Sequence, residues 1–108
     1  MYYKIKIPNK LKVGGHQYLV EYVKSRDVEK GNSNWGITHL SEKKIQLDKE
    51  LKGTSTIEEV FVHELLHTAL HETKLNYDLE DKKEEEFVNR LGASLYQILK
   101  DNKLWVKK

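Results

Sequence analysis

Two histidines and a glutamate in the middle of the chain are the residues whose types and spacing could do chemistry. They form the pattern H-E-x-x-H, in the stretch His63-Glu64-Leu65-Leu66-His67. Residues four apart lie one turn apart on the same face of a helix, so the two imidazoles can converge on one cation. Glu64 lies to the side of that face, where it can accept a proton from a water molecule that the metal activates. The pattern predicts one zinc ion per chain, with His63 and His67 as ligands and Glu64 as the base of a metallopeptidase-type hydrolase.

A catalytic zinc ion would need one more protein ligand, because such sites usually take three and keep one position for water. The chain has no cysteine, so the ligand must be His, Asp or Glu. His71 follows His67 by four residues, but it would lie about 12 Å along the helix axis from His63, and three imidazoles in one row cannot reach one ion. His71 is therefore expected at the rim of a cleft or in a surface role. The longer pattern with a glycine and a third histidine is absent, since Leu70 and Thr73 stand at those positions.

A carboxylate from the next helix is the other source of a third ligand. The run Glu84-Glu85-Glu86 lies in the first turns of that helix, where the helix dipole also favours acidic residues without any metal. Glu84 and Glu85 precede the apolar stripe by one turn, so they are the better placed to face the first helix. Periodicity alone does not choose between these two, and Glu86 is the remaining candidate.

The residues around the motif predict a helix that carries it. Glu58 follows Ser55 by three residues, which is the spacing of a capping box. Apolar residues then recur at helical spacing and predict a helix from about residue 56 to about residue 73. These residues are Ile57, Val60, Phe61, Leu65, Ala69 and Leu70.

A second, longer amphipathic helix is predicted to run to about residue 102. Asp81 and Glu84 form a possible capping box at its start. Its apolar positions are Phe87, Val88, Leu91, Leu95, Ile98 and Leu99, and the first four of them define the expected buried stripe.

The first half of the chain predicts short strands, among them a hairpin at Gly14-Gly15. The expected strands cover residues 3–7, 11–13, 17–23, 34–40 and 43–47. Strands followed by helices indicate an α+β fold, with the H-E-x-x-H helix and the second long helix on one face of a small, mostly antiparallel sheet.

Composition predicts a single globular domain over residues 1–108. The formal net charge is +2, which is too balanced to indicate nucleic-acid or membrane binding. No apolar run approaches the roughly 18 residues of a membrane span, and the N-terminus lacks the apolar core of a signal peptide. A cytoplasmic location is therefore expected.

The chain resembles the small zincin-type metallopeptidase domains of bacteria and their phages, close to the ImmA/IrrE group and the minigluzincins. The resemblance covers most of the chain, and H-E-x-x-H is its sharpest part. The other matching pieces are Val13-Gly14-Gly15, Trp35-Gly36-Ile37-Thr38, Ile45-Gln46-Leu47, and Glu85-Glu86-Phe87-Val88-Asn89 leading into Leu91-Gly92-Ala93.

This resemblance implies a third ligand, a substrate groove and a substrate class. The family's ligand is a glutamate four residues before a helical asparagine, which is Glu85 here. The strand over residues 34–39 would form the upper rim of the cleft, where an extended peptide could pair with it and where Trp35, Gly36 and Ile37 would contact the substrate. The substrate would be a peptide or a protein.

Metallopeptidases of this kind usually place a Tyr or His near the developing oxyanion. Tyr77, His71 and Tyr96 are the candidates, and the sequence selects none of them. The alternative to an enzyme is a regulatory or binding module of a phage or bacterium with a structural zinc. The intact Glu64 argues for the enzyme, because a purely structural site needs no base.

Overall fold

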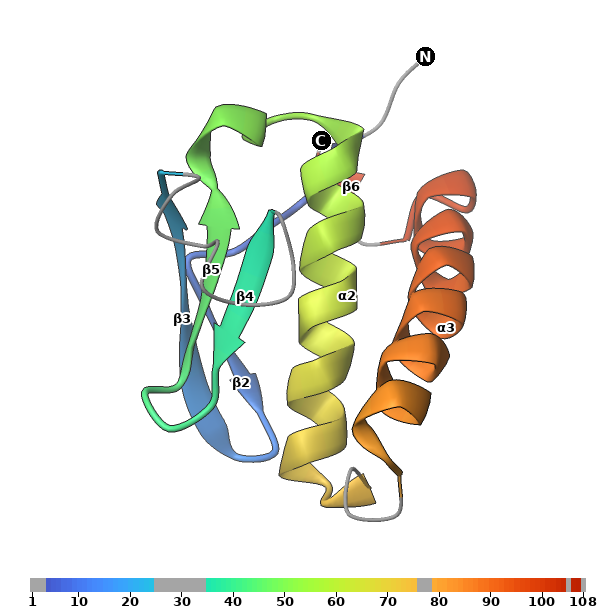
Figure 1. Cartoon of the computed structure of the whole chain (residues 1–108). Helices are drawn as coiled ribbons and strands as arrows, with labels where there is room; N and C mark the ends of the chain where they lie inside the picture. The colour runs from blue at the N-terminus through green and yellow to red at the C-terminus, as the bar shows by residue number, and fades with distance from the viewer. Residues whose placement is uncertain (1–3, 25–34, 76–78, 105, 108) are drawn as a thin grey trace.

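The computed structural model describes residues 4–24, 35–75, 79–104 and 106–107, which form an α+β arrangement of strands and two long helices (Figure 1). Strands β2 (Lys10–Val13), β3 (His16–Val23), β4 (Gly36–His39) and β5 (Lys44–Asp48) form one sheet. A short 3₁₀ helix, η1 (Lys49–Leu51), leads to α2 (Ser55–Glu72), and α3 (Asp81–Asp101) follows. Near the two ends of the chain, β1 (Lys4–Ile5) pairs with β6 (Val106–Lys107) in an antiparallel ribbon.

The sheet is mixed, so the prediction of a mostly antiparallel sheet was wrong. Its order is β2-β3-β5-β4, with β5 inserted between β3 and β4. β2 and β3 form the predicted hairpin, and β4 and β5 are also antiparallel, but β3 and β5 run parallel. The sequence shows each hairpin through its turn, whereas the pairing of β3 with β5 joins segments that are not consecutive and has no local signal.

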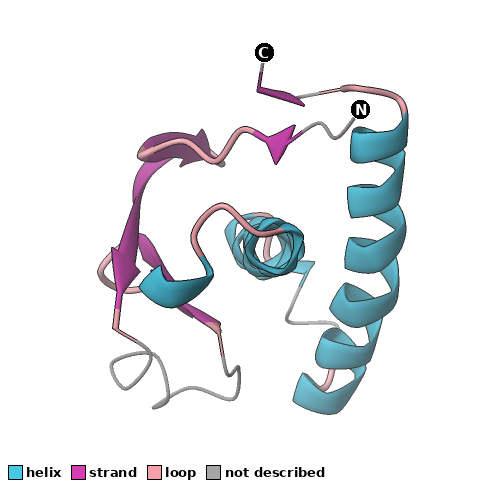
Figure 2. Cartoon of the chain, turned by 90° about the horizontal axis from the view of Figure 1, so that it is seen from above, coloured by secondary structure: helices cyan, strands magenta, loops and turns pink. Residues whose placement is uncertain are grey.

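The elements form three layers, with α2 between the sheet and α3 (Figure 2). The sheet and α2 share a core of Val20, Ile45, Leu47, Ile57 and Phe61. On the opposite side of α2, Gly92 of α3 is buried, and a Cβ there would lie 3.7 Å from the Cα of His63. α3 therefore lies close to the backbone of α2 beside the motif, and a Cβ at position 92 would make ordinary van der Waals contact there. Among the described residues, no helix has both the length and the apolar character that a membrane span requires.

Fewer residues of α3 are buried against α2 than the sequence predicts. Val88 and Gly92 are buried, but Phe87, Leu91 and Ile98 are 45%, 42% and 49% exposed. The prediction that Phe87 and Leu91 belong to the buried stripe was therefore wrong. An apolar stripe of this width would fit a helix that packs on a sheet, but α3 packs against a single helix, which covers fewer of its positions.

Both helices begin near the predicted residues, but neither uses the predicted capping box. The N-cap of α2 is Thr54, whose Oγ1 accepts a hydrogen bond from the Ile57 amide at 3.2 Å. Glu58 is buried and accepts hydrogen bonds from the amide of Ile5 at 3.1 Å and from the hydroxyl of Tyr96 at 2.8 Å. The cap of α3 is Glu80, which makes no side-chain cap hydrogen bond. Glu58 thus bonds to residues from distant parts of the chain and does not close the predicted capping box.

The C-terminal end of α2 is tied to the sheet by Glu72. The buried Tyr18 hydroxyl donates a hydrogen bond to Glu72 Oε2 at 2.5 Å, and Lys43 Nζ lies 3.0 Å from the same oxygen. The hydrogen bond from Tyr18, followed by that from Lys43, holds the pKa of Glu72 below its usual value. This contact fixes the far end of the helix that carries the motif.

We expect acid to remove the stabilisation that Glu72 provides. Because the pKa of Glu72 is lower in the folded than in the unfolded chain, this stabilisation is complete above the ordinary pKa of a glutamate and is lost as the pH falls through the folded value. Glu72→Gln should lower the Tm at neutral pH and flatten the fall of the Tm towards acid pH, as measured by circular dichroism. Glu59→Gln, on an exposed residue of the same helix, is the control. Parallel Tm curves for wild type and Glu72→Gln would contradict this role.

Candidate metal centre

The two motif histidines meet on the side of α2 that faces α3. His63 Nε2 lies 3.2 Å from His67 Nε2, and both side chains are partly buried. Their rings meet edge to face, with centroids 4.9 Å apart. The one-turn spacing of the sequence thus brings two imidazole nitrogens to one point, as the motif predicts.

Glu85 of α3 reaches across to both histidines. Its Oε1 lies 2.9 Å from His63 Nε2 and its Oε2 lies 3.0 Å from His67 Nε2. The three residues each offer one ligand atom, and these atoms lie within 4.8 Å of one another, so the group could hold a metal ion. Two imidazole nitrogens and one carboxylate oxygen are a donor set that suits zinc. The Glu85 side chain is 50% exposed, which leaves the cluster open on one side.

The other two glutamates of the run have different partners. Glu84 Oε2 lies 2.7 Å from His67 Nδ1, the ring nitrogen that points away from Glu85. A carboxylate at Nδ1 holds the proton on that nitrogen, so the Nε2 lone pair is available to a metal. Glu86 pairs with Arg90 on its own helix at 3.3 Å. The structure therefore brings Glu85 to the histidines and gives Glu84 a supporting contact that sequence reasoning did not foresee.

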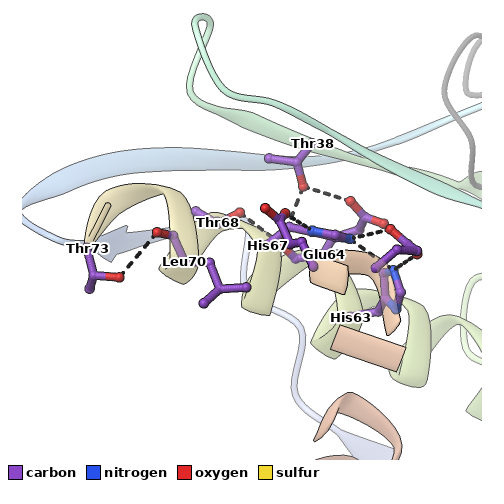
Figure 3. Close-up of polar contacts among 9 residues, drawn as sticks. Thr38, His63, Glu64, His67, Thr68, Leu70 and Thr73 are labelled. Carbon is purple, nitrogen blue, oxygen red and sulfur yellow. Dashed lines mark hydrogen bonds and ion pairs between the residues drawn. The ribbon is translucent and has the colours of Figure 1, made fainter. Parts of the chain in front are cut away.

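Glu64 lies beside the histidines on α2, on the side of the helix that faces the sheet. Its Oε1 accepts a hydrogen bond from Thr38 Oγ1 of β4 at 2.8 Å (Figure 3), and the residue is only 4% exposed. Thr68 Oγ1 donates to the backbone oxygen of Glu64 at 2.9 Å. Burial raises the pKa of the Glu64 carboxyl above its usual value, while the hydrogen bond from Thr38 and the two nearby histidines oppose the rise. Such a carboxylate is a stronger base than one in water.

Gly36 is what allows β4 to come this close to α2. A Cβ at this position would lie 2.6 Å from Val60 Cγ1 and 3.4 Å from Glu64 Cγ. Only a glycine fits there without a shift of the neighbouring strand or helix, and Thr38 two residues later then reaches Glu64. The sequence showed Gly36 and Thr38 only as part of a family-like stretch, so the contact between Thr38 and Glu64 was missed as a site feature.

The predicted substrate strand is at the edge of the described sheet. β4 pairs with β5 on one side only in the strand order. Trp35, just before β4, is 45% exposed, Ile37 is half-buried, and Gly36 is buried against α2. A role for these residues in substrate binding stays a prediction, with Gly36 able to contribute only its backbone.

Neither of the two oxyanion candidates that the structure describes, His71 and Tyr96, belongs to the metal-binding group. His71 lies on α2, half-buried, and is not one of the residues that could hold a metal. Tyr77 lies outside the described residues. The Tyr96 hydroxyl donates to Glu58 and accepts a hydrogen bond from Lys100 Nζ at 2.8 Å. The structure thus gives no support to Tyr96 in this role, because its contact with Glu58 ties α3 to the start of α2 and its contact with Lys100 lies within α3.

An open hollow of about 720 Å³ borders the cluster on the side of α3. It gives solvent a route to the exposed side of Glu85. Its lining is mainly charged and consists of His67, Asp81, Lys82, Glu84, Glu85, Glu86, Asn89 and Arg90.

No protein-family model matches the chain, and neither the curated proteins nor the solved structures include a significant match to it. The resemblance to zincin-type domains therefore rests on the residues of the chain itself.

Zinc binding should depend on Glu85 and the histidines. We expect wild type to retain about one zinc ion per chain after dialysis, and His67→Ala and Glu85→Ala to lose it, because each removes one of three ligands. Glu84→Gln should weaken zinc affinity about 10- to 100-fold, since it alters the partner that orients His67. Elemental analysis and calorimetric titration measure both effects.

Glu86→Ala is the matched control for these variants, because Glu86 belongs to the same acidic run but pairs with Arg90. It should retain zinc as wild type does. Retention of zinc by Glu85→Ala, or a wild type that takes up none, would contradict this ligand set.

The close approach of β4 to α2 predicts a steric coupling between Gly36 and Val60. Gly36→Ala should lower the free energy of unfolding by about 1–3 kcal/mol, because the valine is stiff and the core must shift. In a Val60→Ala background, Gly36→Ala should lower the free energy of unfolding by much less, because the methyl group that clashes with the new Cβ is absent. Urea unfolding of the four proteins of this cycle measures the difference, and equal costs in both backgrounds would exclude the clash.

Proposed function

We propose that this protein is a zinc-dependent hydrolase of the metallopeptidase type that cleaves a peptide or a protein. One observation carries the proposal: the imidazoles of His63 and His67 and the carboxylate of Glu85 converge from two helices, with the buried carboxylate of Glu64 on the same helical turn. Two histidines, a glutamate and an adjacent base are the parts that zinc peptide hydrolysis requires.

Zinc bound there would polarise the scissile carbonyl and make a water molecule acidic enough to attack it. The chain supplies the proton transfer through Glu64, whose carboxylate takes the proton of the attacking water and delivers it to the leaving amine. Thr38 fixes one oxygen of this carboxylate by its hydrogen bond of 2.8 Å, so the other oxygen is the one free to exchange a proton. Glu84 holds His67 in the ring orientation that presents Nε2.

The edge strand β4 supports a peptide as the substrate. Its outer edge is not paired within the described sheet, so an extended chain can add to it by main-chain hydrogen bonds. Thr38 of this strand already contacts Glu64, so a peptide on β4 would run past the catalytic base. The exposed Trp35 at the start of the strand offers an apolar surface for a substrate side chain.

A regulatory or binding module with a structural zinc is the second candidate, and one observation favours it. Glu64 is almost fully buried and its Oε1 is engaged by Thr38. A carboxylate held in this way could serve the packing of β4 on α2 and have no part in turnover.

Glu64→Gln separates the two candidates. In an enzyme it should keep zinc and lose about 10²- to 10⁴-fold in kcat, because the base is replaced by an amide of the same shape. Turnover is measured by mass spectrometry of a peptide library incubated with the zinc-loaded protein, and Glu59→Gln on the same helix is the control. Absence of any cleavage that depends on Glu64, with zinc fully bound, would exclude the enzyme and favour the binding module.

A further inference from the structure

The hydrogen-bond ladder between β4 and β5 fixes the direction in which the main chain of each β4 residue points. The register of the two strands, extended by one residue, places Trp35 opposite Asp48, and the amide of Asp48 donates to the carbonyl oxygen of Trp35 at 2.8 Å. In an antiparallel pair, hydrogen-bonded and non-hydrogen-bonded positions alternate. Ile37 and His39 therefore bond to β5 through their main chain, whereas the main-chain N–H and C=O of Thr38 point to the outer edge of the sheet.

Thr38 thus presents two different groups to two different neighbours. An extended peptide that adds to the outer edge of β4 bonds to the residues whose main-chain groups point outward, and Thr38 is one of them. Its side chain faces α2, where Oγ1 donates to Glu64 Oε1 at 2.8 Å, as Figure 3 shows. The residue therefore lies between the edge on which a substrate would add and the carboxylate of Glu64.

The hydroxyl of Thr38 follows the backbone of β4 closely. A β-branched side chain has few rotamers on a strand, so the position of Oγ1 is set by the position of the main chain. The strand is already packed tightly on α2, since a Cβ at Gly36 would lie 2.6 Å from Val60 Cγ1. Glu64 is buried, and a buried carboxylate depends on its donors more than one in water does. A shift of β4 is therefore transmitted to the carboxylate of Glu64.

We propose that Thr38 is a positioning residue that couples the binding of the substrate to the orientation of Glu64. Its main-chain N–H and C=O bond to one residue of an extended substrate. Its hydroxyl holds Oε1 of Glu64, which leaves Oε2 for the proton of the attacking water. This inference rests on the proposed hydrolytic function and adds to it that pairing of the substrate fixes the strand that holds the base.

The same pairing determines how the side chains of the substrate are distributed. Residues opposite each other on neighbouring strands project from the same face of a sheet. The substrate residue that pairs with Thr38 therefore projects towards α2, on the side where Glu64 lies. Its two neighbours project from the other face, beside Ile37 and His39. The substrate is accordingly an unfolded, extended segment, because a helix or a tight turn cannot make this pairing.

The kinetics of Thr38→Val and Thr38→Ser test the positioning role. Valine has nearly the shape of threonine without its hydroxyl, so Thr38→Val should keep zinc and KM and lower kcat about 10- to 100-fold. Thr38→Ser retains a hydroxyl and should recover most of the lost kcat. Thr56→Val, at an exposed threonine of α2, is the matched control.

Two outcomes separate this inference from the function on which it rests. A wild-type kcat in Thr38→Val, combined with loss of turnover in Glu64→Gln, would overturn the inference and leave the hydrolase intact. A zinc-loaded wild type that cleaves no peptide would overturn the proposed function, and the inference with it.

Amide hydrogen exchange followed by NMR tests the pairing without measuring turnover. In the free protein the amide of Thr38 should exchange fast and those of Ile37 and His39 slowly, because only the latter two donate to β5. A peptide that the wild type cleaves, added to zinc-loaded Glu64→Gln, should slow the exchange of Thr38 alone. Slow exchange of Thr38 in the free protein, or exchange that the peptide leaves unchanged, would overturn the pairing.

Discussion

Helix α2 lies between two layers of the protein, so its polar side chains must find partners inside the fold. An unpaired polar group buried there would cost about as much as the packing around it contributes. Three glutamates of this helix accept hydrogen bonds from three different parts of the fold. Glu58 accepts from the chain's first strand and from α3, Glu64 accepts from β4, and Glu72 accepts from β3. The same contacts join the layers to one another, so the fold and its buried charges stabilise each other.

The candidate metal centre is a product of this arrangement. His63 and His67 point to the α3 side of α2, where Glu84 and Glu85 are available. Glu64 points to the sheet side, where Thr38 holds it. One helical turn thus presents the two histidines towards α3 and, beside them, the carboxylate of Glu64 that the sheet holds. Gly36 on β4 lets the strand come close enough to α2 for the short side chain of Thr38 to reach Glu64.

Helix α3 has a different position, because α2 is its neighbour on one side only. A narrow seam around Val88 and Gly92 attaches it to α2, and Phe87, Leu91 and Ile98 stay exposed. A small domain with exposed large side chains in a regular row has surface to bury against another molecule.

The sequence by itself determined the features that depend on local spacing. H-E-x-x-H fixed the convergence of His63 and His67, because four residues make about one helical turn. Apolar periodicity predicted both long helices, and Gly14-Gly15 predicted the β2–β3 hairpin, which the structure confirms. The α+β class followed from the order of the elements.

Only the tertiary structure decided which groups from distant parts of the chain meet. The spacing of the acidic run could not choose between Glu84 and Glu85, because the choice depends on how α3 is rotated and shifted against α2. The parallel pairing of β3 with β5, the contact of Thr38 with Glu64, and the diversion of Glu58 from its cap to Tyr96 have the same origin. Each joins residues far apart in sequence, and local propensity carries no information about which distant partner will offer the better hydrogen bond or the closer packing.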